Sequence, residues 1–551
     1  MIALRPADEV MRLERMGSFF PTRLSFMRSL IRRMNENRWT IKPARFDLDD
    51  NGYGVAVYAA DTGKRVYSLV AFSQALDAAR RTDRVIAEEW DATFVLFDGS
   101  PSDDDIRRLA GNVPKQEAGR CSVSELSLSR ANKSLRLFEH IVQRLAGGKQ
   151  PDMEMVNDVG YLMRTTAVYG NGKFGMADRD KYLHRPELQG PFAVEMLSVY
   201  LTRCFTLDLV EHVARRRDPA RFVPLAPAVK RFIGIGNATG LGMAPFLMSH
   251  PILINNWFMA RETALARVRS LESAVPGTVA RFAELLHRAE RHVAEWNVDD
   301  RRQMARILSL REDISALRAR KLAGRRPWNA LYGWAEGALS LEGQELLVSL
   351  MLEPHGELID ELADQMSADE AAPIDPAMTL ADLRAAIAEH YAWALDIDFS
   401  DAEQVRRIWY VSEEKLEPRL GDRDDELGIE YEMPFAIARD VQALDGLLAA
   451  EPAADTVADF LMARPDYRYT LRRVQTTARL PYAEIRSNLI GADCLPIDLL
   501  RCKLSFFGAA KFDPRSDRWT RITMYQGAPL ADELHAPDAD DWLFPVMPTC
   551  Q

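Results

Sequence analysis

The spacing of apolar residues changes once along this chain of 551 residues, and that change limits the folds it can adopt. Between Trp39 and Phe97, short apolar runs such as VAVYAA and RVYSLVAF flank the turn DTGK, which predicts antiparallel strands. From about Ser129, apolar residues recur every three or four positions, which predicts helices. Two extended runs around Asp513 to Asp517 predict a hairpin. The sequence therefore predicts an α+β, predominantly α-helical protein: a helical core with a small N-terminal antiparallel β-meander unit and a short C-terminal β-hairpin.

The length exceeds what one hydrophobic core usually organises, so we expect several structural units. The stretch SADEAAPIDPAM is acidic, contains prolines and has no sustained period, which makes it the best linker candidate. The predicted division is an N-terminal mixed unit over 1–125, a helical core with two glycine-rich loops over 126–366, the linker over 367–378, and a C-terminal helical unit with the terminal hairpin over 379–551.

Two features describe the expected helical core. The segment from Pro191 to Arg217 is apolar on most sides and ends in RRRDP, so it predicts a central helix whose last turn carries the cations that the helix dipole favours. Apolar residues between Val279 and Trp296 follow alternating steps of three and four, and the segment ending near Leu317 repeats that spacing. These two segments are expected to form an antiparallel helix pair.

Charge and cysteine usage exclude some classes of function. The net charge is −11, so no general excess of positive charge is present to bind nucleic acid. The five cysteines form no C-x-x-C motif, which favours reduced thiols and a cytoplasmic location. No secretory signal is evident at the N-terminus, and the longest apolar run, Met243 to Ala260, is interrupted by polar residues and a proline. We therefore expect no membrane segment.

The stretch IGIGNATGLGMAPF holds four glycines in the nine residues from Gly234 to Gly242. Glycine lets backbone N–H groups turn toward a ligand, so the stretch could form a loop that binds a phosphate or carboxylate. Asn237 and Thr239 would add side-chain hydrogen bonds. The spacing matches neither the dinucleotide fingerprint nor the P-loop, so we reject both assignments. The alternative is that the glycines only permit a tight connection between two helices.

A second glycine-rich stretch runs from Arg164 to Tyr182 and contains GNGKFG. A lysine among glycines places a compact cation beside exposed backbone donors, which suits an anion. The kinase motifs that could accompany such a loop are missing, so that resemblance is discarded. The pair Asn171-Gly172 is equally a turn signal, so an ordinary loop remains an alternative.

Other chemistry receives less support. The segment from Tyr482 to Gly508 sets charged residues among apolar ones, so these charges either pair structurally or form a site with shifted pKa values. None of the nine histidines belongs to an H-x-x-x-H pair, and no metal site is expected. The serine-hydrolase elbow G-x-S-x-G is also absent.

Two hypotheses follow from the sequence. The first is a cytoplasmic enzyme that holds a small anionic substrate or phosphate-bearing cofactor between the two glycine-rich loops, with reaction type and cofactor unknown. The candidate catalytic residues are Tyr169, Lys173 and Asp178, and the candidate binding residues are Arg164, Asn171, Gly234, Gly236, Asn237, Thr239, Gly240 and Gly242. The second is a non-enzymatic homo-oligomeric or partner-binding helical protein. Neither hypothesis includes nucleic acid or membrane as a partner.

Overall fold

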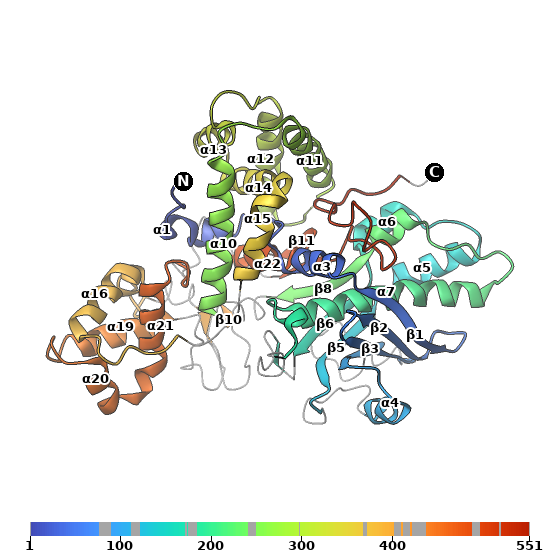
Figure 1. The fold of residues 1–551 in the computed structure, drawn as a ribbon, viewed down its shortest axis with the longest axis horizontal. Coiled ribbons are helices and arrows are strands. Elements are labelled where there is room, and N and C mark those ends of the chain that lie inside the picture. The colour runs from blue at the N-terminus through green and yellow to red at the C-terminus, as the bar shows by residue number, and fades with distance from the viewer. Residues whose placement is uncertain are drawn as a thin grey trace.

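The fold is known from a computed structural model, shown in Figure 1. It describes residues 2–76, 90–111, 122–170, 173–174, 184–240, 250–296, 298–366, 372–401, 409–410, 419–420, 437–486, 496–516 and 519–549. None of the described helices is long and apolar enough to cross a membrane.

Ten of the described strands form one sheet that includes residues from both halves of the chain. The strands are β1 (Thr40–Leu48), β2 (Gly54–Asp61), β3 (Val66–Ser73), β4 (Ala92–Asp98), β5 (Glu125–Lys133), β6 (Tyr161–Gly170), β7 (Lys173–Phe174), β8 (Gly234–Gly240), β11 (Lys511–Ser516) and β12 (Trp519–Met524). Their order is β1-β2-β3-β4-β5-β6-β8-β12-β11, and β7 pairs with β6. All of these pairs are antiparallel except β6 with β8, which are parallel. A parallel pair needs a long crossover, here supplied by the helices between the two strands.

The expected fold class is wrong in its main point, because the sheet is not a small N-terminal meander. It curls through the first 240 residues and takes in three strands, β5, β6 and β8, where only helices were expected. For β8 the physical reason is that GIGNATG has almost no apolar residues, so its strand character is set by its neighbours and not by a period of its own. Strands β11 and β12 do form a hairpin, but β12 also pairs with β8, so the hairpin is one end of the same sheet. The protein is a mixed α+β protein.

The helices surround this sheet and continue beyond it (Figure 1). The α-helices are α1 (Ala7–Val10), α2 (Leu13–Met16), α3 (Phe26–Glu36), α4 (Asp103–Ala110), α5 (Leu135–Ala146), α6 (Met153–Val159), α7 (Ala193–Arg217), α8 (Pro227–Phe232), α10 (Pro251–Arg269), α11 (Pro276–Ala294), α12 (Arg301–Arg318), α13 (Pro327–Ala338), α14 (Leu341–Leu352), α15 (Gly356–Ile359), α16 (Leu380–His390), α17 (Ala392–Leu395), α19 (Ile437–Leu448), α20 (Val457–Ala463), α21 (Arg468–Arg479) and α22 (Pro496–Phe507). Short 3-10 helices are η4 (Pro186–Leu188), η6 (Glu353–His355), η7 (Asp360–Gln365) and η8 (Pro465–Tyr467), and β9 (Trp409–Tyr410) pairs with β10 (Arg419–Leu420).

The sheet has two differently covered faces. We call the face toward α7 the inner face, where Tyr58 and Phe94 pack edge-on against Phe205 of α7. The opposite, outer face carries an apolar cluster on β2 to β5 that is covered by Ile106 and Leu109 of α4. Because α7 is buried along most of its length, the prediction of a central helix in this part of the chain is confirmed.

The predicted pair of apolar helices is also present. Helices α11 and α12 contact each other, and their apolar residues Phe282, Val293, Ile307 and Ile314 are buried within the chain. Of the proposed linker, residues 372–378 form neither helix nor strand, and residues 367–371 lie outside the described ranges. The division into four units stays a prediction.

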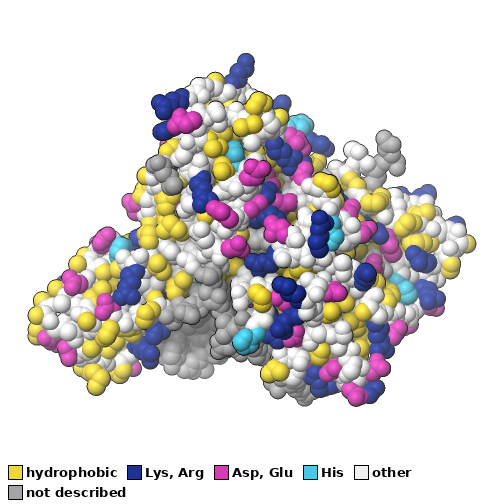
Figure 2. Space-filling view, in the orientation of Figure 1, with side chains coloured by type: hydrophobic (Ala, Val, Ile, Leu, Met, Phe, Trp, Pro, Cys, Tyr) yellow, Lys and Arg dark blue, Asp and Glu magenta, His cyan; other side chains and the backbone are white. Residues whose placement is uncertain are grey.

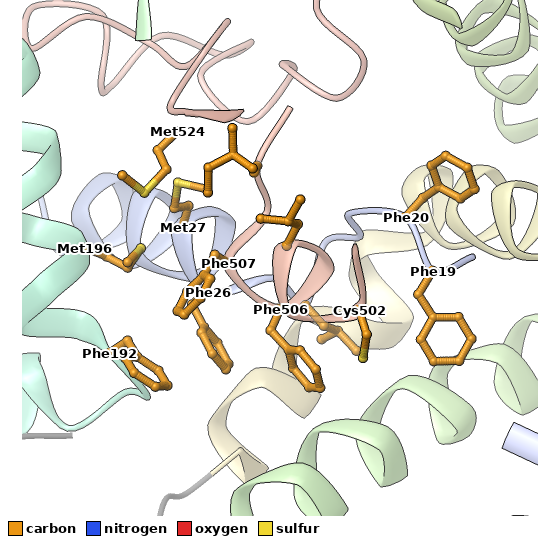
Figure 3. Close-up of a cluster of buried hydrophobic side chains, with 14 of the residues drawn as sticks. Phe19, Phe20, Phe26, Met27, Phe192, Met196, Cys502, Phe506, Phe507 and Met524 are labelled. Atoms are coloured by element: carbon orange, nitrogen blue, oxygen red, sulfur yellow. The ribbon is translucent and has the colours of Figure 1, made fainter. Parts of the chain in front are cut away.

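An aromatic cluster makes the core continuous from the sheet to the helices (Figure 3). The rings of Phe26, Phe192 and Phe507, from α3, the start of α7 and α22, lie 5.2–5.9 Å apart. The neighbouring Phe506 extends the cluster to Trp257 of α10, with ring centroids 4.1 Å apart. Edge-to-face and offset rings of this kind add to the stabilisation from burial.

A buried ionic network fixes the N-terminal segment to the helices. The carboxylate of Glu345, on α14, accepts hydrogen bonds from Arg5 at 2.6 Å, from Arg15 at 2.7 Å and from Arg261 of α10. Arg5 also binds both carboxylate oxygens of Glu262 at 2.7 Å. Burial alone would raise the pKa of Glu345, but the surrounding arginines hold it well below its ordinary value.

The substitution Glu345→Gln should destabilise the protein by about 3–5 kcal/mol, because it leaves buried arginines without their shared counter-charge. Arg12→Gln is the control: its side chain is 59% exposed, so its effect should stay within about 0.5 kcal/mol. Urea denaturation followed by circular dichroism measures both. Equal, small effects of the two substitutions would contradict the importance of this network.

The C-terminal segment, residues 525–549, has no helix or strand, and two adjacent acids bind it to the rest of the chain alongside its buried apolar side chains. Asp540 lies 2.7 Å from Arg23 and 3.1 Å from Arg28, both on the N-terminal side of the chain. Asp541 binds Arg281 and Arg288 of α11. Figure 2 shows acidic and basic side chains gathered together near the centre of the molecular surface in that view. Charge pairing and apolar burial together therefore fix this segment without secondary structure.

The stability that Asp541 contributes should depend on pH. Burial opposes ionisation of Asp541, but hydrogen bonds from Arg288 and Arg281 outweigh it and lower its pKa from 3.8 to about 2. A lowered pKa gives a contribution that is present above about pH 4 and is lost as the pH falls toward 2. Asp541→Asn should therefore cost about 2 kcal/mol at pH 7 and progressively less below pH 4. The measurement is urea denaturation at several pH values. Asp538→Asn is the control, because the Asp538 side chain is 64% exposed. A pH-independent difference would contradict the assignment.

Candidate functional site

The first glycine-rich stretch is a strand of the sheet rather than a loop between helices. Gly234–Gly240 form β8, which pairs with β6 on one side and with β12 on the other. In a strand with two neighbours, the backbone N–H and C=O groups point in the plane of the sheet toward those neighbours. Over residues 234–237, where both neighbours pair with β8, the backbone is therefore used by the sheet, and ligand chemistry there would have to come from side chains.

Two of these glycines are required by close packing. A Cβ atom at Gly234 would lie 2.3 Å from the carbonyl oxygen of Met524, and one at Gly236 would lie 2.5 Å from the ring of Tyr161. The Tyr161 side chain itself is almost completely buried. The glycines thus let a ring and a neighbouring strand approach β8 closely, which is a structural reason for the composition of this stretch.

The two glycine-rich stretches do lie side by side, because β6 and β8 are neighbours. Arg164 is opposite Gly236, and Thr165 is opposite Asn237. The amide of Asn237 donates a hydrogen bond to the Thr165 hydroxyl at 3.2 Å, and that hydroxyl donates to the Gly236 carbonyl at 3.2 Å. Asn237 belongs to the inner face with Ile235, whereas Arg164 and Gly236 belong to the outer face.

The other predicted residues lie farther along the same strands. Tyr169 pairs with Leu128 and with Phe174, and Lys173 pairs with Gly170. Thr239 and Gly240 pair with Thr520 and Trp519 of β12. Asn171, Asp178 and Gly242 lie outside the described residues.

The structure separates these residues into two groups. Lys173 of β7 lies opposite Gly170 of β6. Because a strand rises about 3.3 Å per residue, this position is about 20 Å along β6 from the row that contains Arg164 and Gly236. Gly170 and Gly240, in contrast, are the last residues of two parallel strands, so they lie at the same end of those strands. The Tyr161 ring covers Gly236, so a ligand at this row would meet Arg164 rather than the glycine. A ligand at the strand ends would be near Tyr169 and Lys173.

Two further arginines lie on the outer face near Arg164. Arg130 of β5 pairs with Ala167, and Arg521 of β12 pairs with Ala238, so both lie between the Arg164 row and the strand ends. The guanidinium of Arg130 is 5.0 Å from the centre of the Trp90 ring. We call Arg130, Arg164 and Arg521 the outer-face arginines. Sequence reasoning missed two of them because strand pairing brings them together from distant parts of the chain.

The electrostatics of this face favour an anion. Arg164 is partly exposed and makes no hydrogen bond or ion pair with another described residue. Glu125, an acid on the same face at the start of β5, is already bound by Arg108 of α4 at 2.7 Å. A guanidinium in this setting offers planar, paired donors that match a carboxylate or phosphate.

The described charges of the segment from Tyr482 to Gly508 have structural partners. Glu484 is buried and accepts hydrogen bonds from Arg473 at 2.8 Å and from the Tyr391 hydroxyl at 3.0 Å. Asp498 is bound by Arg306, and Arg501 binds Glu342 at 2.7 Å. These three charges therefore have partners within the fold.

The described part of the chain contains neither an activated thiol nor a group of side chains that could bind a metal ion. Burial raises the pKa of the Cys204 thiol to about 12 and also raises that of Cys502, so both are protonated at neutral pH. No group of three or more His, Cys, Asp or Glu side chains among the described residues is placed to hold a metal ion.

Comparison of the chain with protein-family models, curated proteins and solved structures gave no match.

The packing role of Gly236 is testable. Gly236→Ala should destabilise the protein by about 1–3 kcal/mol, because the new methyl group would overlap the Tyr161 ring. Gly277→Ala in α11 is the matched control: a Cβ there meets nothing within 4 Å, so the change should be neutral or slightly stabilising. Urea denaturation compares the two. Equal stability of Gly236→Ala and wild type would show that β8 is not packed as described.

Proposed function

We propose that the protein binds a small anionic ligand, carrying a phosphate or carboxylate group, on the outer face of the sheet at Arg164. The observation that carries the proposal is that Arg164 is a partly exposed cation without a partner among the described residues. Arg130 lies on the neighbouring strand β5 and Arg521 on β12, one strand farther away, and both belong to the same face. From β5 to β12 the group crosses three inter-strand spacings, so it spans about 14 Å across the sheet.

This arrangement differs from a loop that cradles an anion with backbone groups. The strands fix the backbone positions of the three arginines, while the long side chain of Arg164 can adjust to the ligand. The cost of ordering that side chain is part of the binding free energy. Phosphate or carboxylate oxygens would replace water around Arg164 with charge-assisted hydrogen bonds.

The catalytic part of the hypothesis stays a prediction. Tyr169 and Lys173 lie near the last residue of β6, farther along that strand than the outer-face arginines. A ligand held by Arg164 and extending toward the end of β6 would approach them. Either side chain could then donate a proton to the ligand or accept one from it. We therefore propose an enzyme that acts on such an anion, with Tyr169, Lys173 and Asp178 as its candidate catalytic residues.

The alternative of a helical assembly protein receives less support. The apolar surfaces of α11 and α12, which were candidates for a partner-binding strip, are buried inside the chain. The large apolar side chains that the described part of the chain does expose are single residues of different segments, and α12 itself exposes Leu308: Val123, Leu135, Val275, Leu308, Leu341, Met462 and Tyr469. Scattered apolar residues of this kind are normal on monomers.

Arg164→Gln should abolish most of the stabilisation that the protein gains from phosphate. A ligand that binds only the folded state raises its melting temperature, and removal of the cation should weaken binding about tenfold. The measurement is thermal unfolding in millimolar phosphate, compared with chloride at the same ionic strength. Arg136→Gln, at an exposed arginine of α5, is the control for loss of one positive charge.

The expected result is a phosphate-dependent rise for wild type and Arg136→Gln and a much smaller rise for Arg164→Gln. The same rise in all three proteins would refute the proposed site, and no rise in wild type would refute phosphate binding itself.

A further inference from the structure

A cleft of about 470 Å³ opens between α8, α11 and the C-terminal segment, on elements that do not belong to the outer-face site. Its volume lies within the range of small-molecule sites, which are typically about 300–1,000 Å³. Its walls differ in chemistry, and that difference indicates the kind of molecule that would fit.

One wall is charged and comes from α11. Glu284, His287, Arg288 and Arg291 recur at steps of three and four, so they form one stripe along the helix facing the cleft. Arg288 is committed to Asp541 at 2.5 Å and to Glu284 at 3.1 Å. Arg291, at the end of the stripe, is exposed and makes no ion pair or hydrogen bond with another described residue.

The acids that face the cleft are already neutralised. Asp541 and Glu284 are each shared by Arg281 and Arg288. Asp538 lies 3.5 Å from Arg231 of α8. His287 faces Glu290, which is also bound by Arg318. The positive charge of Arg291 therefore remains uncompensated at the mouth of the cleft.

The opposite wall is apolar. Phe232 closes the end of α8, and Trp542, Pro545, Val546 and Pro548 come from the C-terminal segment. Trp542 and Phe232 are each only 4% exposed, so these rings are fixed by packing before any ligand enters. The arginines around Asp540 and Asp541 hold this wall in place.

We propose that this cleft is a second ligand site, which takes a small amphipathic carboxylate. The carboxylate would bind the free guanidinium of Arg291, and its apolar body would lie along Pro545, Pro548 and the ring of Phe232. Only a molecule with both parts satisfies both walls: a bare anion leaves the apolar wall in water, and a neutral apolar molecule leaves Arg291 without a partner.

The test uses hexanoate as the probe, with acetate and 1-hexanol as its two halves, in isothermal titration of the full chain. Hexanoate should bind at least tenfold more tightly than acetate or 1-hexanol. Arg291→Gln should weaken hexanoate binding about tenfold. Arg302→Gln is the matched control, because Arg302 is an exposed arginine of the adjacent helix α12 without a partner among the described residues. The affinity of Arg302→Gln for hexanoate should equal that of wild type.

The proposal is overturned if 1-hexanol binds as well as hexanoate, if Arg291→Gln binds like wild type, or if wild type binds no hexanoate at millimolar concentration. Arg291 is exposed, so an unchanged melting temperature of the variant without ligand is expected and checks that it folds. The two proposed sites can fail separately: Arg164→Gln should leave hexanoate binding intact, and Arg291→Gln should leave the phosphate-dependent stabilisation intact.

Discussion

The close approach of Tyr161 to Gly236 is the contact on which the arrangement of the sheet depends. A side chain at position 236 would push the Tyr161 ring away, and a side chain at position 234 would meet the backbone of β12. With glycine at both places, β8 can lie between β6 and β12 and join the strands of the first half of the chain to the hairpin near its end. Arg164 and Arg521 reach the same face of one sheet only because of this strand.

Charge, rather than apolar burial alone, fixes the ends of the chain. The N-terminal segment is held by Arg5 and Arg15 at the buried Glu345, and the C-terminal segment is held by Asp540 and Asp541. Taking such groups out of water is unfavourable unless nearly every charge meets its partner. Both segments also bury apolar side chains, such as Met16 and Trp542, so the directional ion pairs add to apolar burial and select one position for each segment. The apolar cluster around Phe26 and Phe507 lies between the sheet and the helices.

The sequence revealed some features of the fold and could not reveal others, for physical reasons. The strands from Gly54 to Asp98 and the helix from Ala193 to Arg217 have clear periods, and both are present. Strand β8 has almost no apolar pattern, since GIGNATG is mostly glycine and polar residues, so its strand character is set by its neighbours. Of the candidate site, Arg164, Gly236 and Asn237 were found to be close together, but the contributions of Arg130 and Arg521 depend on pairing between distant strands. The cleft at Arg291 depends on a segment without regular structure, for which a periodic pattern does not exist.

The two proposed sites share one part of the chain. Arg521 belongs to β12, and the apolar wall of the cleft follows directly in residues 525–549. His292 of α11 ties both regions together, because its ring nitrogens lie 2.9 Å from the Ala510 carbonyl oxygen and 2.7 Å from that of Pro545. Removal of the C-terminal segment would therefore disturb both surfaces and would not show which one binds a given ligand. Single substitutions at Arg164 and Arg291 avoid this difficulty, since each removes a cation without a partner among the described residues and leaves the shared segment bound by its own ion pairs.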